Sequence, residues 1–191
     1  MLLLIRVHLR SSAAIILMEL EQLLETCPDY AKDLKLNLGA VLRQTELTER
    51  QTWGTAVCSA MASRNRRVLE AVQAEASRHL DEPALFAARA AGAVMGMNNI
   101  FYRFRHLSSN EKYGSMPARL RMQVIRTHGS DPVDFELWCL AVSAINGCGV
   151  CVDSHEKVLR EKGVGEETIL AAVRIASVIH ALAAVMDAVT A

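Results

Sequence analysis

The sequence predicts an all-α protein made of helical hairpins packed as bundles. Apolar residues recur at spacings of three and four almost everywhere from Met18 onward, which is the pattern of amphipathic helices. No run of alternating apolar and polar residues indicates a strand, and only 4 Pro and 10 Gly interrupt the 191 residues. So few turn-forming residues argue against a β-sandwich or a β-barrel.

The first 17 residues do not fit the helical pattern that follows. Arg6, His8 and Arg10 interrupt the apolar segment before it is long enough to span a bilayer. The apolar stretch also precedes the charges, which reverses the order found in signal peptides. We expect residues 1–17 to be an extension, either a mis-assigned start or a targeting segment, and favour translation from Met18. The helical domain is expected to cover residues 18–191.

Capping signals delimit the first half of this domain. One apolar stripe begins at Leu20, and a second follows Pro28. The second stripe comprises Tyr30, Leu34, Leu38, Val41 and Leu42. Thr48 followed by Gln51 is a capping-box pattern that opens the next helix. Asp81 with Pro83 then opens a helix whose apolar positions are Phe86, Ala90, Val94 and Met97.

The second half begins with a polar, glycine-containing segment at 105–116, which predicts a loop. Pro132 precedes a helix that runs to Asn146-Gly147, and Gly163 ends the one after it. The last helix is expected from about Glu166 to Val189. Shifting residues 86–104 by 51 positions lays them over 137–155 with several matches, which two pseudo-repeated helix-break-helix units or chance would explain.

Charge and cysteine content exclude several classes of protein. Lys plus Arg equals Asp plus Glu at 21 each, so no nucleic acid partner is expected. Arg174, His180 and Asp187 interrupt the last apolar helix, so no membrane span is expected. The five cysteines are odd in number and loosely spaced, which favours a reducing cytoplasm over a secreted disulfide framework.

The residues that point to chemistry lie between 136 and 155. Cys148 and Cys151 are separated by two residues and follow a helix break, and a helix N-terminus stabilises a thiolate there. His155 lies four residues beyond Cys151, so imidazole and thiol share one helix face. If the chain folds back at the break, Glu136 stands at a similar height to His155 and can orient it as a base.

Other interpretations of these residues remain open at this stage. Cys148, Cys151, His155 and Glu136 offer four zinc ligands, although structural zinc sites usually use two Cys-x-x-Cys arms and the chain has one. The position at a helix N-terminus favours Cys148 as the more exposed and activated thiol, whereas the proximity of His155 as a base favours Cys151. The remaining candidates are expected to be ordinary core or surface residues, namely Cys27, Cys58, Cys139, Met95, Met97, Met122 and His180.

The pattern Glu136, Cys148-x-x-Cys151 and His155 resembles the signature of the alkyl hydroperoxidase AhpD family, within the carboxymuconolactone decarboxylase-like superfamily. The segments PDYAKDLKLNL (28–38), MGMNNIFYR (95–103), LRM (120–122) and FELWCLAVSAING (135–147) resemble the same family. The resemblance covers the chain from about Met18 to the C-terminus. One departure is Val150, at a position where members often have His.

The resemblance implies an AhpD-like helical bundle, usually a homotrimer, that reduces alkyl hydroperoxides and regenerates the peroxiredoxin AhpC. Electrons come from dihydrolipoamide on a lipoyl-bearing dihydrolipoamide acyltransferase, and no metal or flavin is bound. The resemblance also assigns Cys151 as the peroxide-attacking thiol and Cys148 as its resolving and disulfide partner. His155 is assigned as the base and Glu136 as the residue that orients it. A carboxymuconolactone decarboxylase-type enzyme and a non-enzymatic zinc-binding interaction module remain the alternatives.

Overall fold

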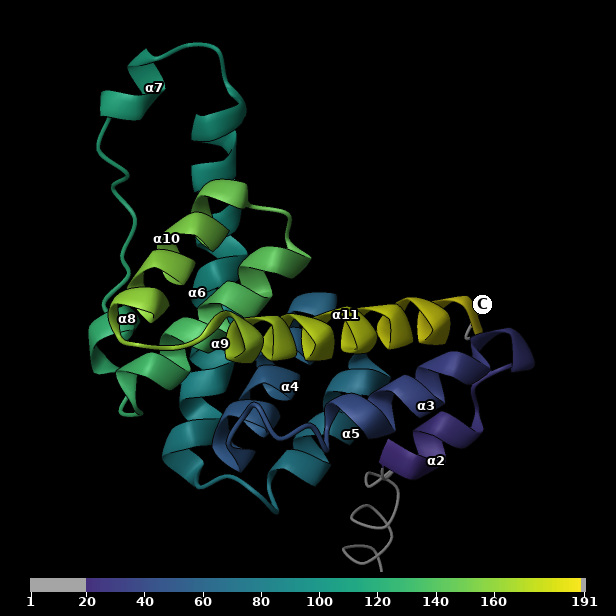
Figure 1. Ribbon diagram of the computed structural model, residues 1–191. Helices are drawn as coiled ribbons and strands as arrows, with labels where there is room; N and C mark the ends of the chain where they lie inside the picture. The colour runs from purple at the N-terminus through teal and green to yellow at the C-terminus, as the bar shows by residue number, and fades with distance from the viewer. Residues whose placement is uncertain (1–19, 190–191) are drawn as a thin grey trace, which may run out of the picture.

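The computed structural model describes residues 20–189, and within this range it contains only helices and their connections (Figure 1). The extension at 1–17 and the start at Met18 lie outside the described residues, so that boundary stays a prediction. In chain order the elements are α2 (Leu20–Glu25), the 3-10 helix η1 (Asp29–Ala31), α3 (Lys32–Val41), α4 (Glu49–Ser63), α5 (Arg66–Ala76), α6 (Glu82–Leu107), α7 (Lys112–Ser115), α8 (Val124–Thr127), α9 (Pro132–Ile145), α10 (Gly149–Glu161) and α11 (Glu166–Val189).

The predicted helix starts are confirmed by their caps. The hydroxyl of Thr48 accepts from the backbone N–H of Gln51 at 3.2 Å, and the Gln51 side chain accepts in return from the backbone of Thr48 at 3.1 Å. The carboxylate of Asp81 caps α6 by accepting from the backbone of Ala84 at 2.9 Å. These bonds satisfy N–H groups that have no partner within the helix itself.

Helix α4 forms the centre of the bundle, because α6, α9 and α11 all pack against it. Ten of its residues are buried, including most of the stretch from Thr52 to Ala60. Small side chains along α4 let its neighbours approach closely, and the fully buried ring of Trp138 from α9 lies against the backbone at Gly54.

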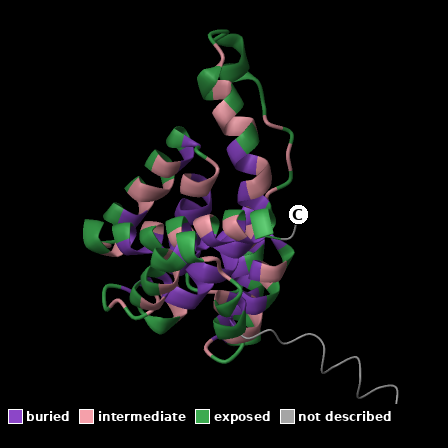
Figure 2. Ribbon diagram, turned by 90° about the vertical axis from the view of Figure 1, so that its right-hand side faces the viewer, coloured by how far each residue is buried: buried purple, intermediate pink, exposed green. Residues whose placement is uncertain are grey.

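One feature of the fold is an arm that extends beyond the bundle. The C-terminal part of α6, together with α7, projects upward in Figure 1, and the same segment is mostly exposed in Figure 2. Chain from the arm returns along α8 to the start of α9. The arm therefore places one wall beside the α9–α10 hairpin, where the candidate site lies.

Several sequence predictions are wrong in detail. Residues 105–116 are not one loop, because α6 continues through Leu107 and α7 forms after Asn110 accepts a hydrogen bond from the Lys112 backbone at 3.2 Å. The helix-break-helix repeat also fails, because α6 runs unbroken through the segment matched to the α9–α10 turn. Tyr30 and Phe86, placed on apolar stripes, are 74% and 56% exposed.

The last helix, α11, has the predicted bounds and is long and apolar enough to suggest a membrane span by composition alone. Half of its most apolar window is buried inside the protein. It packs against α3, α4 and α9, which is the behaviour expected of a core helix.

Two glycines in helix interiors provide a matched test of this packing. A Cβ at Gly54 would lie 2.2 Å from the Trp138 ring, whereas one at Gly96 would meet nothing within 4 Å. We expect Gly54→Ala to lower the free energy of unfolding by about 1–3 kcal/mol through overpacking. Gly96→Ala should raise it by about 0.5–1 kcal/mol through helix propensity. Urea unfolding followed by circular dichroism measures both, and equal effects would contradict the close packing at Gly54.

Candidate active site

The site is built on the hairpin formed by α9 and α10. Gly147 has a φ of 64°, a left-handed conformation that glycine adopts without strain, and it ends α9 so that α10 can fold back against it. The backbone N–H of Cys148 donates to the carbonyl of Ser143 at 3.1 Å, which closes the turn. Cys148 then becomes the N-cap of α10.

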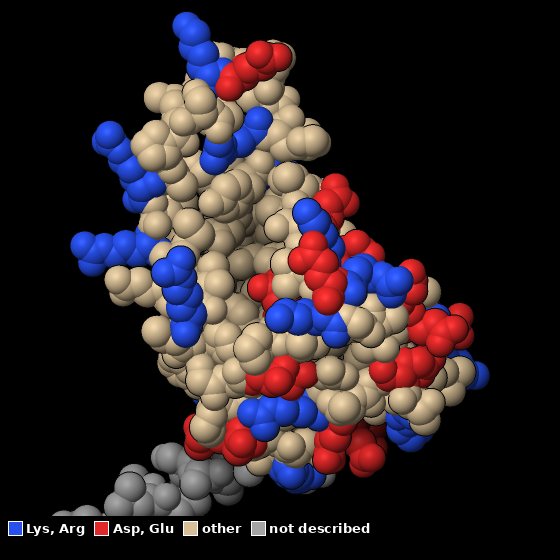
Figure 3. All heavy atoms as spheres, turned by 60° about the vertical axis from the view of Figure 1, so that its left-hand side comes forward, with Lys and Arg blue, Asp and Glu red and all other residues tan. Residues whose placement is uncertain are grey.

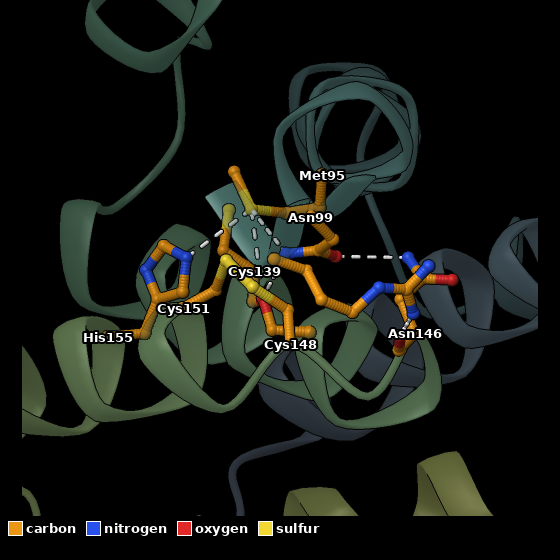
Figure 4. Close-up of a disulfide and its surroundings, with 9 residues drawn as sticks. Met95, Asn99, Cys139, Asn146, Cys148, Cys151 and His155 are labelled. Atoms are coloured by element: carbon orange, nitrogen blue, oxygen red, sulfur yellow. Dashed lines mark hydrogen bonds between the residues drawn. A yellow bond between two sulfur atoms is a disulfide. The ribbon is translucent and has the colours of Figure 1, made fainter. Parts of the chain in front are cut away.

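Side chains from α6 hold this turn in place. Asn99 is fully buried; it donates to the Ser143 hydroxyl at 2.9 Å and accepts from the side chain of Asn146 at 3.0 Å (Figure 4). Arg103 donates to the backbone carbonyl of Asn146. Movement of the turn would break the two bonds that Asn99 and Arg103 make with Asn146, so α6 helps to fix the position of the neighbouring Cys148 relative to the bundle.

The structure brings all four predicted site residues together. Cys148 and Cys151 are joined by a disulfide, with 5.3 Å between their Cα atoms. The Nδ1 atom of His155 lies 2.7 Å from the Oε2 atom of Glu136. An ionised carboxylate can only accept, so in this contact Nδ1 carries the proton and Nε2 keeps its lone pair. The fold-back from α9 to α10 therefore gives an imidazole that can act as a base.

The two cysteines differ in access, and the expectation for Cys148 is wrong. Cys148 is fully buried, while Cys151 is 7% exposed and lines a cavity of about 290 Å³. The N-cap position is covered by α6 and the turn, so a helix terminus here does not mean an exposed sulfur. A molecule that enters the cavity meets Cys151, with His155 beside it.

Sequence reasoning missed the part of the cavity that comes from outside the hairpin. Met95 was expected to be a core filler; it is buried, but its Sδ also lies 3.3 Å from Nε2 of His155 (Figure 4). Met122 likewise lines the cavity rather than only the core. The complete lining is Met95, Asn98, Tyr102, Met122, Ile125, Val150, Cys151, Ser154 and His155.

Asn98 is the most informative of the missed residues. It lines the cavity, is 5% exposed, and its Oδ1 atom is buried without a hydrogen-bond partner among the described residues. A buried acceptor without a partner costs free energy, which distinguishes Asn98 from the other residues that line the cavity. The adjacent amides Asn98 and Asn99 on an otherwise apolar helix were the available signal.

The other three cysteines are free thiols whose pKa values are raised by burial. Burial raises the pKa of Cys58 to about 12 and holds the pKa of Cys139 well above the usual thiol range. Cys27 is half-buried rather than fully buried, and burial again raises its pKa. His180, expected to be unremarkable, is exposed and contacts the Ser63 hydroxyl at 3.2 Å.

No group of three or more His, Cys, Asp or Glu side chains in residues 20–189 is arranged to hold a metal ion. In the hairpin itself the two sulfurs that a zinc site would need are bonded to each other. The donors in this arrangement fit disulfide chemistry better than they fit the four-ligand set of a structural zinc site.

Comparisons with known proteins agree with this geometry. The model of the carboxymuconolactone decarboxylase family matches residues 111–191. An alkyl hydroperoxide reductase AhpD from Solibacter usitatus is 75% identical over 170 residues, covering 89% of this chain and 96% of that protein. The corresponding proteins of Acidobacterium capsulatum and Streptomyces griseus are 66% and 54% identical, each over 90% of this chain and over 94% and 97% of their own lengths.

The pKa values predict which thiols react in the reduced native protein. At pH 8 a thiol with a pKa near 12 is ionised about once in 10,000 molecules, so Cys58 should resist iodoacetamide, and Cys139 likewise. Cys151 should be alkylated first and the buried Cys148 more slowly. Peptide mass spectrometry over time measures the order, with Cys151→Ser and urea-unfolded protein as controls. Equal native rates at Cys58 and Cys151 would contradict it.

Proposed function

Since the chain belongs to the alkyl hydroperoxide reductase AhpD family, we propose that it reduces alkyl hydroperoxides with its Cys148–Cys151 pair and dihydrolipoamide-derived electrons. The observation that carries this proposal is the disulfide beside the Glu136–His155 pair, with Cys151 and His155 lining the same cavity. Nothing in this cycle requires a bound metal or flavin, because two thiols supply both electrons.

In the oxidative half of the cycle, His155 takes the proton of the Cys151 thiol, and Glu136 stabilises the imidazolium that forms. The thiolate attacks the terminal oxygen of the hydroperoxide and breaks the O–O bond, which yields an alcohol and a sulfenic acid on Cys151. The Cys148 thiol then displaces water from that sulfur and forms the disulfide. One hydroperoxide and two thiols thus give an alcohol, water and a disulfide.

In the reductive half, a dithiol attacks the disulfide at Cys151, because the other sulfur is buried. Cys148 leaves as a thiolate at the N-terminus of the 13-residue helix α10, where the helix dipole stabilises negative charge. The second thiol of the donor closes its own disulfide, and both site cysteines return to thiols. We assign both encounters, with the hydroperoxide and with the dithiol, to the sulfur of Cys151.

The proposed partners follow from this chemistry. The electron donor is the lipoyl group of a dihydrolipoamide acyltransferase, and the acceptor besides free peroxide is the peroxiredoxin AhpC. A cycle that depends on reduced thiols needs a reducing compartment, so we place the protein in the cytoplasm.

A homotrimer is the proposed assembly. Ile100, Phe104 and Leu107 form an apolar stripe on the arm and are 56%, 52% and 75% exposed. Their spacing of four and three puts them on one face of α6, and such a face is normally covered by another chain. A second copy of this protein is the proposed cover, and analytical ultracentrifugation of the native protein checks it.

Asn98 is the proposed positioning residue for the hydroperoxide. Its unpartnered Oδ1 can accept the O–H of a hydroperoxide that has entered beside Cys151. This bond would hold the peroxide with its O–O bond near the attacking sulfur. The apolar remainder of the lining, including Ile125 and Val150, suits an alkyl group better than a charged one.

The redox cycle is tested by mass spectrometry of the reduced native protein. One equivalent of an alkyl hydroperoxide should remove two hydrogens from the peptide or peptides bearing Cys148 and Cys151, and dihydrolipoamide should restore them. Cys151→Ser should abolish the reaction, whereas Cys148→Ser should stop at the sulfenic acid. Cys58→Ser is the matched control and should leave the cycle intact.

A different result would favour one of the alternatives. Catalysis that survives replacement of both site cysteines would indicate a decarboxylase-type activity. Stoichiometric zinc that protects both thiols in the purified protein would indicate an interaction module, and either finding would refute the proposed cycle.

A positioning role of Asn98 can be distinguished from a structural role, because positioning of the hydroperoxide affects only the oxidative half of the cycle. Asn98→Leu should lower kcat/KM for the hydroperoxide about tenfold, the loss expected for one hydrogen bond worth ~1.4 kcal/mol. Reduction of the disulfide by dihydrolipoamide should be unchanged. Thermal unfolding should show equal or higher stability, because an unsatisfied buried acceptor has been removed. Loss of both half-reactions would instead show a structural role.

A further inference from the structure

Basic residues are concentrated in the segment that forms the arm and its return to the bundle. Residues 103–126 contain six basic residues and one acidic residue, although the whole chain has 21 of each kind. The basic residues are Arg103, Arg105, Lys112, Arg119, Arg121 and Arg126, and the acidic residue is Glu111. The remainder of the chain therefore has an acidic surplus, and the basic surplus is confined to residues 103–126.

Within this segment, two arginines have structural roles and three do not. Arg103 donates to the carbonyl of Asn146, and Arg105 donates to the carbonyl of Gly114. By contrast, three exposed side chains make no ion pair or hydrogen bond with any residue from 20 to 189. These are Arg119, Arg121 and Arg126, which we call the arginine rim.

The opposite wall of the cavity is different. On α10, Lys157 lies 3.9 Å from a carboxylate oxygen of Glu161, and Arg160 lies 3.9 Å from one of Glu156 and 2.8 Å from one of Glu166. The basic side chains within α10 therefore have acidic partners in the chain. Those of the arginine rim have none among the described residues, which leaves their charge available to another molecule.

The arginine rim borders the cavity that contains Cys151. Arg121 directly precedes Met122, and Arg126 directly follows Ile125, and both apolar residues line that cavity. Arg126 also lines a neighbouring hollow of about 370 Å³ that shares Met122 and Ile125. Figure 3 shows a hollowed, uncharged surface with Lys and Arg along one side and mixed charges along the other.

We propose that the arginine rim is the docking surface for an acidic protein surface that presents a dithiol to Cys151. This inference rests on the proposed function and names the chemistry of its electron donor. The rim residues do not line the cavity of Cys151 itself, so they fit a body that stays outside while its dithiol enters. Guanidinium groups pair with carboxylates in a planar, bidentate manner and steer association over several ångströms.

The transfer that docking promotes balances without a further reactant. One thiolate of the carrier attacks Cys151 and breaks the bond to Cys148, and the second carrier thiol attacks the mixed disulfide. Two electrons and two protons pass from the carrier dithiol to the site cysteines, and the carrier leaves as a cyclic disulfide.

Synthetic carriers of defined charge test this proposal. Three peptides carry dihydrolipoyl-lysine between flanks of three Glu, three Ser or three Lys residues, and the rate of Cys148–Cys151 reduction is followed by quenched mass spectrometry. At low salt the Glu peptide should react about tenfold faster than the Ser peptide, and the Lys peptide more slowly than either. At 0.5 M salt the three rates should converge, because screening removes the steering.

Two variants with the same change in net charge separate the rim from charge in general. Arg119→Gln/Arg121→Gln/Arg126→Gln should lose the preference for the Glu peptide while reacting normally with free dihydrolipoamide. Lys32→Gln/Arg66→Gln/Lys162→Gln removes exposed basic residues that do not line the cavity and should keep the preference. Equal preferences in the two variants would overturn the proposal.

Further measurements distinguish the remaining outcomes. Fluorescence anisotropy of the oxidised peptides measures docking without electron transfer, so it tests the rim even if dihydrolipoamide fails to reduce the wild-type disulfide. That failure with intact Glu-peptide binding would refute the proposed function and leave the rim standing. A change of sedimentation coefficient in the rim variant would instead show an interface between copies of this chain and overturn the inference.

Discussion

The whole site depends on one backbone constraint, the left-handed turn at Gly147. Because the chain reverses there, α10 runs back along α9, and Glu136 meets His155 at 2.7 Å although the two are 19 residues apart. The same reversal places Cys148 at the cap of α10 and lets it reach Cys151. An L side chain at that φ would be strained. Any movement of the turn would break the bond that Asn99 accepts from Asn146 and the bond that Arg103 donates to it.

The turn also distinguishes two of the five cysteines, because it brings Cys148 and Cys151 together in a disulfide. Burial raises the pKa of Cys58 and Cys139 so far that neither forms much thiolate, and thiolate is the species that exchanges disulfides. Cys148 is as buried as these two, but it sits at a helix N-terminus and is bonded to Cys151. Local geometry, rather than exposure alone, therefore separates the disulfide-bonded cysteines from the three free ones.

The sequence predicted the parts of the site that local rules govern. A glycine after an asparagine predicted the turn, and helical rise placed Glu136 and His155 at the same height. It did not predict that Cys148 is buried or that Asn98 and Met95 line the cavity. These residues of α6 lie 50 or more positions before Cys148, so their contacts with the hairpin are tertiary. The false repeat has the same origin. The repeat aligned Gly96 with Gly147, but only Gly147 has a positive φ, so the two segments share composition and differ in backbone conformation.

Helix α6 links the interior of the site with its surface. Its buried side presents Asn99 to the turn and Asn98 to the cavity, where a polar atom without a partner costs free energy. Beyond the bundle the chain that continues from it carries the arginine rim, where charge costs little because water solvates it. A largely apolar cavity offers an incoming protein no attraction at a distance. Long-range attraction must then come from outside the cavity. The arginine rim carries unpaired positive charge, and two of its members directly adjoin the lining residues Met122 and Ile125 in sequence.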